Sequence, residues 1–184
     1  MTTTGTILPF RGELPRIAET AFVAPGSTVI GDVEMGDESS LWFNCVVRGD
    51  VNYIRVGPRT NIQDGTVVHV SGAEGYTTIG ADVVIGHMCL IHGCVLEDAC
   101  MIGMGATVMD GVVVETGAWV GAGSLVTPGK HVKAGEMWMG RPARPVREVS
   151  EAEVAEIARI ALNYRNLAVD FMAALKDGPL AAGQ

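Results

Sequence analysis

The chain has 184 residues, of which 48% are hydrophobic and 18% are charged, so it is too apolar for a disordered chain and long enough for one domain, two at most. Its 13 Lys and Arg against 21 Asp and Glu give a formal net charge of -8, which does not favour nucleic acid as a partner. No apolar run of about 18 residues and no basic, apolar leader are present, so we expect a cytoplasmic protein that does not span a membrane.

An apolar residue recurs at every sixth position from Val23 to Trp138, with three breaks. The first run ends at Tyr53, a three-residue shift leads to Val56, the segment 70–78 interrupts, and a five-residue step precedes Leu96. The recurring positions are Val23, Val29, Met35, Leu41, Val47, Tyr53, Val56, Ile62, Val68, Ile79, Ile85, Ile91, Leu96, Ile102, Val108, Val114, Val120, Val126, Val132 and Trp138. A period of six matches neither a helix nor an open strand and predicts short strands joined by tight turns around a narrow prism.

This pattern resembles the hexapeptide-repeat family, whose fold is a left-handed parallel β-helix of triangular section. The resemblance covers residues 11–145, which we expect to form one mainly β domain. Since three hexapeptides make one rung, the twenty positions predict six to seven rungs, and a prism about 30 Å long at about 4.8 Å per rung.

The four cysteines include no CxxC pair, and with no export signal we expect free thiols. Cys45, Cys89 and Cys100 each lie four residues after an apolar position, where a small interior side chain is wanted. Cys94 falls in the five-residue step, and we interpret it as packing too.

A helix is predicted after the repeat stops at Pro142 and Pro145. The residues Ser150 to Glu153 form a capping box, and an apolar stripe at helical spacing follows. We expect this helix over about 151–176, within a terminal unit 150–177 that Gly178-Pro179 ends. Its apolar stripe must lie against the prism or a neighbouring subunit.

Three of the four histidines, His69, His87 and His92, lie within 24 residues. His69 and His92 directly follow apolar positions, so both should point outward. If the segment 70–78 is a loop within one rung, these two share a face in adjacent rungs, and His87 could join them only from another subunit. If the segment fills a hexapeptide, His69 and His87 stack instead. We favour the first arrangement. Three neutral imidazoles with an open fourth position are the coordination of catalytic zinc.

The segments RGDVN at 48–52, NIQDGTVVH at 61–69 and GHMCLIHGC at 86–94 are similar to those of the γ-class carbonic anhydrases and their close homologues, and the match ends at Asn163-Tyr164. The resemblance implies that His69, His87 and His92 bind zinc in a homotrimer, the first and third from one subunit and the second from its neighbour. His131 matches no site residue, and we expect it on the surface.

Further positions take their roles from the same resemblance. Arg48 and Asp50 resemble a pair that forms an ion pair across the trimer interface, although a turn with solvated charges is the alternative. Gln63 resembles the residue that hydrogen-bonds the zinc-bound hydroxide. Asn61 resembles a residue that helps to hold carbon dioxide, and Asp64 an interface carboxylate; turn chemistry is the alternative for both.

Tyr164 looks like the helix tyrosine that borders the active site in that family, with packing for bulk as the alternative. The chain also departs from the family. Val51 stands where active members carry a proton-shuttling glutamate, and Glu74 is the one acid in the loop 70–78. Because each turnover must export a proton, this departure predicts activity that is slow, buffer-dependent or absent.

The resemblance therefore implies a zinc lyase that hydrates carbon dioxide to bicarbonate. Imidazole ligands also suit Fe²⁺ or Co²⁺. A metal-dependent hydrolase such as an acyl-CoA thioesterase is the first alternative, and a catalytically weak assembly protein is the second. A CoA-dependent acyltransferase ranks below these, since that chemistry does not need three converging imidazoles.

Overall fold

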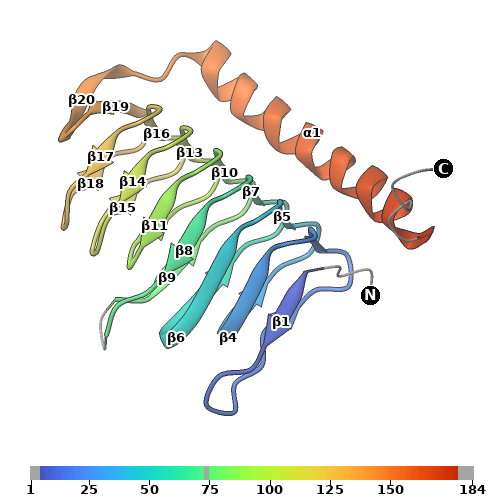
Figure 1. Ribbon diagram of the computed structural model, residues 1–184. Helices are drawn as coiled ribbons and strands as arrows, with labels where there is room; N and C mark the ends of the chain where they lie inside the picture. Colours follow the sequence, from blue (N-terminus) through green and yellow to red (C-terminus); the bar gives the residue numbers. More distant parts are fainter. Residues whose placement is uncertain (1–4, 73–74, 178–184) are drawn as a thin grey trace.

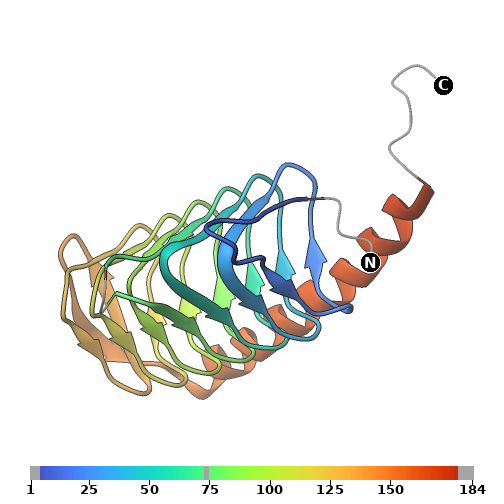
Figure 2. The same ribbon diagram turned by 90° about the horizontal axis from the view of Figure 1, so that it is seen from below.

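The computed structural model describes residues 5–72 and 75–177, which form a left-handed parallel β-helix of about seven turns with one long helix alongside it (Figure 1). Each complete turn contributes a strand segment to each of three faces, so that the coil forms a triangular prism. Figure 2 shows the successive turns stacked along the prism, with the helix running beside them. The fold class predicted from the six-residue period is therefore confirmed.

The first face, called the helix face, packs against the C-terminal helix. Its strands run parallel in consecutive turns, except that the final strand folds back antiparallel and closes the end of the prism. They are β3 (Phe22–Val23), β5 (Ser40–Leu41), β7 (Asn61–Ile62), β10 (Val84–Ile85), β13 (Met101–Ile102), β16 (Trp119–Val120), β19 (Glu136–Gly140) and β20 (Ala143–Glu148).

The second face, called the histidine face, carries His69 and His92. It comprises β1 (Thr6–Leu8), the first parts of β4 (Thr28–Met35) and β6 (Val46–Val56), β8 (Val67–His69), β11 (Leu90–His92), β14 (Thr107–Val108) and β17 (Leu125–Val126). The third face comprises β2 (Arg16–Ile17), the later parts of β4 and β6, β9 (Thr77–Ile79), β12 (Val95–Leu96), β15 (Val113–Val114) and β18 (His131–Val132).

The recurring apolar residues point inward and form one continuous core along the axis of the prism, as predicted, with the exception of Tyr53. Strand β6 continues around a corner of the prism, and its alternation buries Ile54 instead. The Tyr53 ring lies outside, stacked on Tyr76 at 5.1 Å between ring centroids. All four cysteines are free and buried, which confirms their interpretation as interior packing.

The helix α1 (Glu151–Ala174) begins with the predicted capping box, in which Ser150 and Glu153 exchange hydrogen bonds, and ends in a 3₁₀ turn, η1 (Leu175–Asp177). Its N-terminal half buries Ile157 and Ala161 against Val84, and its C-terminal half packs on the β3–β5 end of the helix face. The predicted stop at Gly178-Pro179 lies outside the described residues. Among those described, no helix is long and apolar enough to cross a membrane.

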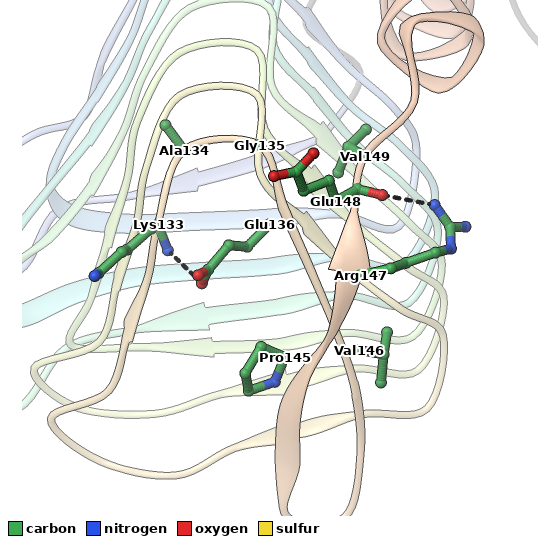
Figure 3. Close-up of a pocket in the computed structure, with 9 residues that line it drawn as sticks. All are labelled: Lys133, Ala134, Gly135, Glu136, Pro145, Val146, Arg147, Glu148 and Val149. Atoms are coloured by element: carbon green, nitrogen blue, oxygen red, sulfur yellow. Dashed lines mark hydrogen bonds between the residues drawn. The ribbon is translucent and has the colours of Figure 1, made fainter.

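The C-terminal end of the prism holds a cavity of about 580 Å³ beneath the β19–β20 hairpin (Figure 3). Two of its charged side chains make local hydrogen bonds: Glu136 accepts from the backbone N–H of Lys133, and Arg147 donates to the backbone carbonyl of Glu148. The three clustered histidines line no part of this cavity.

Candidate metal centre

His69 and His92 occupy equivalent positions on neighbouring strands of the histidine face. Strands β8 and β11 pair in parallel, with His69 opposite His92, and Nδ1 of His69 lies 3.1 Å from Nε2 of His92. Strand β8 ends at His69 and β9 begins at Thr77, so the intervening segment leaves the coil within one rung. This confirms the first of the two arrangements that the sequence left open. Glu74 lies outside the described residues.

Each of these two histidines is held by a carboxylate through its other ring nitrogen. Asp50 contacts Nε2 of His69 at 2.9 Å, and both carboxylate oxygens of Asp110 lie 3.1 Å from Nδ1 of His92. Ser71, just after β8, donates a hydrogen bond to Asp110. Such carboxylate–histidine pairs are the usual outer shell of a metal site, because they fix the ring orientation and the tautomer.

The two carboxylates are well placed to stay ionised. The hydrogen bond from Ser71 is the main cause that holds the pKa of Asp110 below its ordinary value, and the neighbouring His92 adds to it. Burial raises the pKa of Asp50, but hydrogen bonds from His69 and Arg48 outweigh burial, and the net pKa is lowered. Both carboxylates therefore stay ionised at neutral pH and can accept hydrogen bonds from imidazole N–H groups.

The facing nitrogens of His69 and His92 lie at hydrogen-bond distance, and which of them carries a proton depends on the tautomers of the two rings. If Nε2–H of His69 donates to Asp50 and Nδ1–H of His92 donates to Asp110, two lone pairs meet across 3.1 Å. Two lone pairs repel unless a cation lies between or beside them. Two imidazole nitrogens on one tetrahedral zinc lie about 3.4 Å apart, so the observed spacing fits a shared metal.

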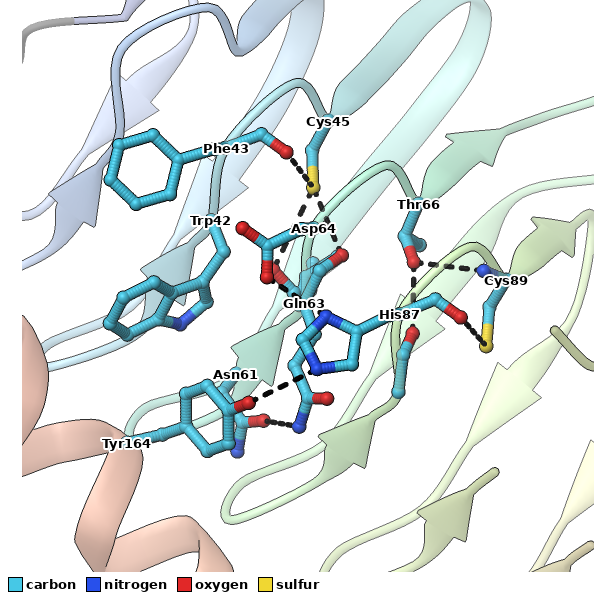
Figure 4. Close-up of polar contacts among 12 residues, drawn as sticks. Trp42, Phe43, Cys45, Asn61, Gln63, Asp64, Thr66, His87, Cys89 and Tyr164 are labelled. Carbon is cyan, nitrogen blue, oxygen red and sulfur yellow. Dashed lines mark hydrogen bonds and ion pairs between the residues drawn. The ribbon is translucent and has the colours of Figure 1, made fainter. Parts of the chain in front are cut away.

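His87 lies elsewhere, on the turn that joins the helix face to the histidine face. Its Nδ1 lies 2.8 Å from Asp64, and its Nε2 lies 3.4 Å from the hydroxyl of Tyr164 on α1 (Figure 4). Burial raises the pKa of Tyr164, and the Asp64 charge adds to the rise, so the phenol stays protonated and can donate. His87 thus resembles the other two in that one ring nitrogen contacts a carboxylate, while its other ring nitrogen contacts the hydroxyl of Tyr164.

A single chain does not assemble the three imidazoles. Within residues 5–72 and 75–177, no group of three or more His, Cys, Asp or Glu side chains is placed to hold a metal ion. The chain presents a pair of histidines on one face and a single histidine at one corner. Such a surface can complete a three-histidine site by meeting another copy of itself, since a head-to-tail contact joins different patches of identical chains.

Gln63 and Asn61 form a buried amide pair beside His87. Gln63 is 5% exposed, and its Nε2 donates to Oδ1 of Asn61 at 3.0 Å (Figure 4). Asn61 is fully buried on β7 and donates in turn to the carbonyl of Val83 at 3.4 Å. Because a buried amide of this kind is fixed in orientation by its hydrogen bond, the side-chain amide of Gln63 lies in one orientation beside the cavity that His87 also lines.

The remaining predicted residues lie near the His69–His92 pair. Arg48 forms an ion pair with Asp50 two residues away in the same chain. Val51 follows Asp50 and is 52% exposed, so this position offers no proton acceptor beside the pair. Sequence reasoning missed Asp110 and Ser71. The available signal was spacing, since Asp110 lies 18 residues after His92, one position beyond the 17-residue rung that places Ile91 opposite Val108.

No protein-family model matches the chain. It is 48% identical over 168 residues to gamma carbonic anhydrase 1, mitochondrial, of Arabidopsis thaliana, an alignment that covers 89% of this chain and 61% of the relative. The chain therefore spans about three fifths of the length of such plant relatives.

Two further matches extend over most of both partners. Protein YrdA of Escherichia coli is 44% identical over 140 residues, which covers 73% of this chain and 76% of YrdA. The crystal structure of a hexapeptide transferase family protein from Anaplasma phagocytophilum has a TM-score of 0.87 and 45% identity, and the match covers 90% of this chain and 98% of that chain.

Proposed function

Because the chain belongs to the γ carbonic anhydrase-like family of hexapeptide-repeat proteins, we propose that it assembles as a homotrimer with a metal ion at each interface and hydrates carbon dioxide to bicarbonate. His69 and His92 of one chain and His87 of the next are the proposed ligands. Zinc is the proposed metal, and Fe²⁺ or Co²⁺ suits the same donors. Its proposed location is cytoplasmic.

One observation carries the proposal: three histidines each keep one ring nitrogen on a carboxylate, and the second ring nitrogens of two of them face each other. The partners are Asp50, Asp64 and Asp110. The surface histidine His131 also pairs with a carboxylate, Glu115, so the support comes from the three pairs lying on neighbouring turns, with His69 opposite His92. The facing nitrogens of His69 and His92 further support a cation between them.

When bound, zinc supplies a hydroxide nucleophile at neutral pH by acidifying water. The chain's own residues supply the remaining functions. Gln63, held by Asn61, would orient the nucleophile by a hydrogen bond from its fixed amide. The protonated hydroxyl of Tyr164 would donate to an oxygen of the substrate or product beside His87. The Asp50 and Asp110 carboxylates keep their imidazoles in the metal-binding tautomer.

Stopped-flow hydration of carbon dioxide by the zinc-loaded protein tests the proposal. We expect activity in the native sequence and at least a hundredfold loss in His87→Ala. The matched control is His131→Ala, because His131 also pairs with a carboxylate, Glu115, at 2.6 Å on another face of the same prism. Equal loss in both variants, or full activity in His87→Ala, would contradict the proposed ligand set.

The same measurement separates the main alternatives. A metal-dependent hydrolase would release acid from acyl esters or thioesters without hydrating carbon dioxide. A catalytically weak assembly protein would bind metal and form trimers, yet show neither reaction.

A further inference from the structure

A groove lies between α1 and the helix face, next to His87. It has a volume of about 360 Å³, and its lining residues are Gln63, Gly86, His87, Met101, Gly103, Met104, Trp119, Ala122, Ile160 and Tyr164. Three polar side chains of this set, Gln63, His87 and Tyr164, belong to the proposed site, and the other side chains are apolar apart from the indole N–H of Trp119. The groove is thus polar on the side of the proposed site and apolar over the rest of its lining.

The groove exists because glycines interrupt a column of side chains. On the helix face, the position after each buried residue holds Gln63 in one rung, and Gly86, Gly103 and Gly121 in the next three. A Cβ at Gly86 would lie 2.6 Å from the backbone nitrogen of Met104, and a Cβ at Gly103 would lie 2.5 Å from that of Ala122. The tight stacking of rungs therefore leaves a floor of backbone without side chains.

The walls of the groove come from two elements. Met101 and Trp119 stand on β13 and β16, one position before the buried residue of each strand, and Ile160 and Tyr164 project from α1. Ile160, Met101 and Trp119 also pack against the core contact that fixes α1 on the prism. Since both walls are held by this packing, the groove is part of the folded chain rather than a surface irregularity.

Carbon dioxide has three heavy atoms and does not require this space, since a cavity of about 300 Å³ already accommodates an organic ligand. No Asp, Glu, Lys or Arg lines the groove. A ligand with a carboxyl group at one end and an aliphatic chain at the other matches it: the carboxyl group would meet Tyr164, Gln63 and His87, and the chain would cover Met101, Trp119 and Ile160.

We infer that this groove binds an aliphatic acyl group of up to roughly eight carbons, with its carboxyl end at His87. The inference rests on the proposed function only in taking the carboxyl end to lie where bicarbonate would form. Two sources share this chemistry: a free monocarboxylate, or an acyl ester or thioester. With an ester, water adds to the acyl carbon, the bond to the alcohol or thiol breaks, and the products are the carboxylate, a proton and the free alcohol or thiol.

Calorimetric titration of the zinc-loaded protein with butanoate, hexanoate and octanoate tests the inference. Burial of each added methylene is expected to tighten binding about two- to fourfold. Affinity that does not change with chain length would overturn it. Titration of the metal-free protein separates the contribution of the chain, which should remain, from that of the carboxyl group.

Two exposed rim positions provide variants that do not disturb the core. Ala122→Phe fills the groove, and Met104→Glu places a negative charge at its edge, so each should weaken octanoate binding at least tenfold. The matched controls, Ala134→Phe and Met139→Glu, make the same changes at exposed positions outside the groove and should leave binding intact. Unchanged octanoate affinity in both rim variants would overturn the inference.

Hydrolysis of 4-nitrophenyl hexanoate distinguishes the two sources. Acid release that Ala122→Phe abolishes identifies acyl esters as the ligand class, and chain-dependent binding without hydrolysis identifies free carboxylates. Failure of this inference would appear as carbon dioxide hydration without chain-dependent binding. Failure of the proposed function would appear as chain-dependent binding without hydration.

Discussion

His69 and His92 face each other across adjacent rungs with 3.1 Å between Nδ1 and Nε2, and each is anchored behind by its own carboxylate. The anchoring aspartates come from different turns of the coil, Asp50 from β6 and Asp110 from the turn after β14. The pair is therefore prearranged by the stacking of the prism rather than by a local motif.

Loss of Asp110 should weaken metal binding, because His92 would no longer be fixed in the metal-binding tautomer. We expect Asp110→Ala to lower zinc affinity by about 10- to 100-fold, measured by competition with a chromogenic chelator, and Ser71→Ala to have a smaller effect in the same direction. Glu115→Gln is the control, since it removes the carboxylate partner of His131. Equal affinities for Asp110→Ala and Glu115→Gln would contradict this role.

Turnover should depend on buffer, because Val51 cannot accept a proton beside the histidine pair. If the chain hydrates carbon dioxide, kcat should rise with imidazole buffer while kcat/KM changes little. Val51→Glu should raise kcat at low buffer, whereas Val146→Glu, at a similarly exposed valine on β20, should not. A high kcat that is independent of buffer concentration would show that another proton path exists.

The cysteines should be unreactive in the folded protein. Burial raises the pKa of Cys45 and Cys89 to about 11 and that of Cys94 to about 12, and it raises the pKa of Cys100 as well. Because the thiolate is the reactive form, a disulfide reagent at pH 8 should modify none of the four in the native state and all four in guanidinium. Rapid modification of any native cysteine would refute the interior placement.

The start of α1 should loosen in acid. Hydrogen bonds from Arg147 and from Ser150 lower the pKa of Glu153 to about 2 in the folded chain, below its ordinary value of 4.5. A lowered folded pKa stabilises the fold above pH 4.5, and this contribution disappears as the pH falls from 4.5 toward 2. Amide exchange of the first turn should therefore accelerate over that range, and Glu153→Gln should remove most of the pH dependence.

Much of the fold could be predicted from the sequence because one side chain per hexapeptide has to point into a narrow core. Tyr53 is the instructive error: it satisfies the six-residue count, but β6 turns a corner there and its pleat buries Ile54. The helix could also be predicted from the sequence, because its capping box and apolar stripe are local signals.

Only part of the candidate site could be predicted from the sequence. The equivalence of His69 and His92 follows from the repeat, once the segment between β8 and β9 is interpreted as a loop. The contacts of Asp110, Asp64 and Tyr164 do not follow, because they join residues one or more rungs apart or bring the helix back to the prism. Such contacts depend on where each turn and the helix come to lie, which no short motif specifies.

The most direct test of the shared metal site is complementation between inactive chains. His69→Ala and His87→Ala chains, unfolded, mixed in equal amounts and refolded, should form random trimers in which about a quarter of the sites draw an intact pair from one chain and an intact His87 from the next. Metal analysis should then find about that fraction of native zinc. Mixing His69→Ala with His92→Ala should restore none, because both defects lie in the same pair. No recovery of zinc in the first mixture, or equal recovery in both, would contradict a site built from two chains.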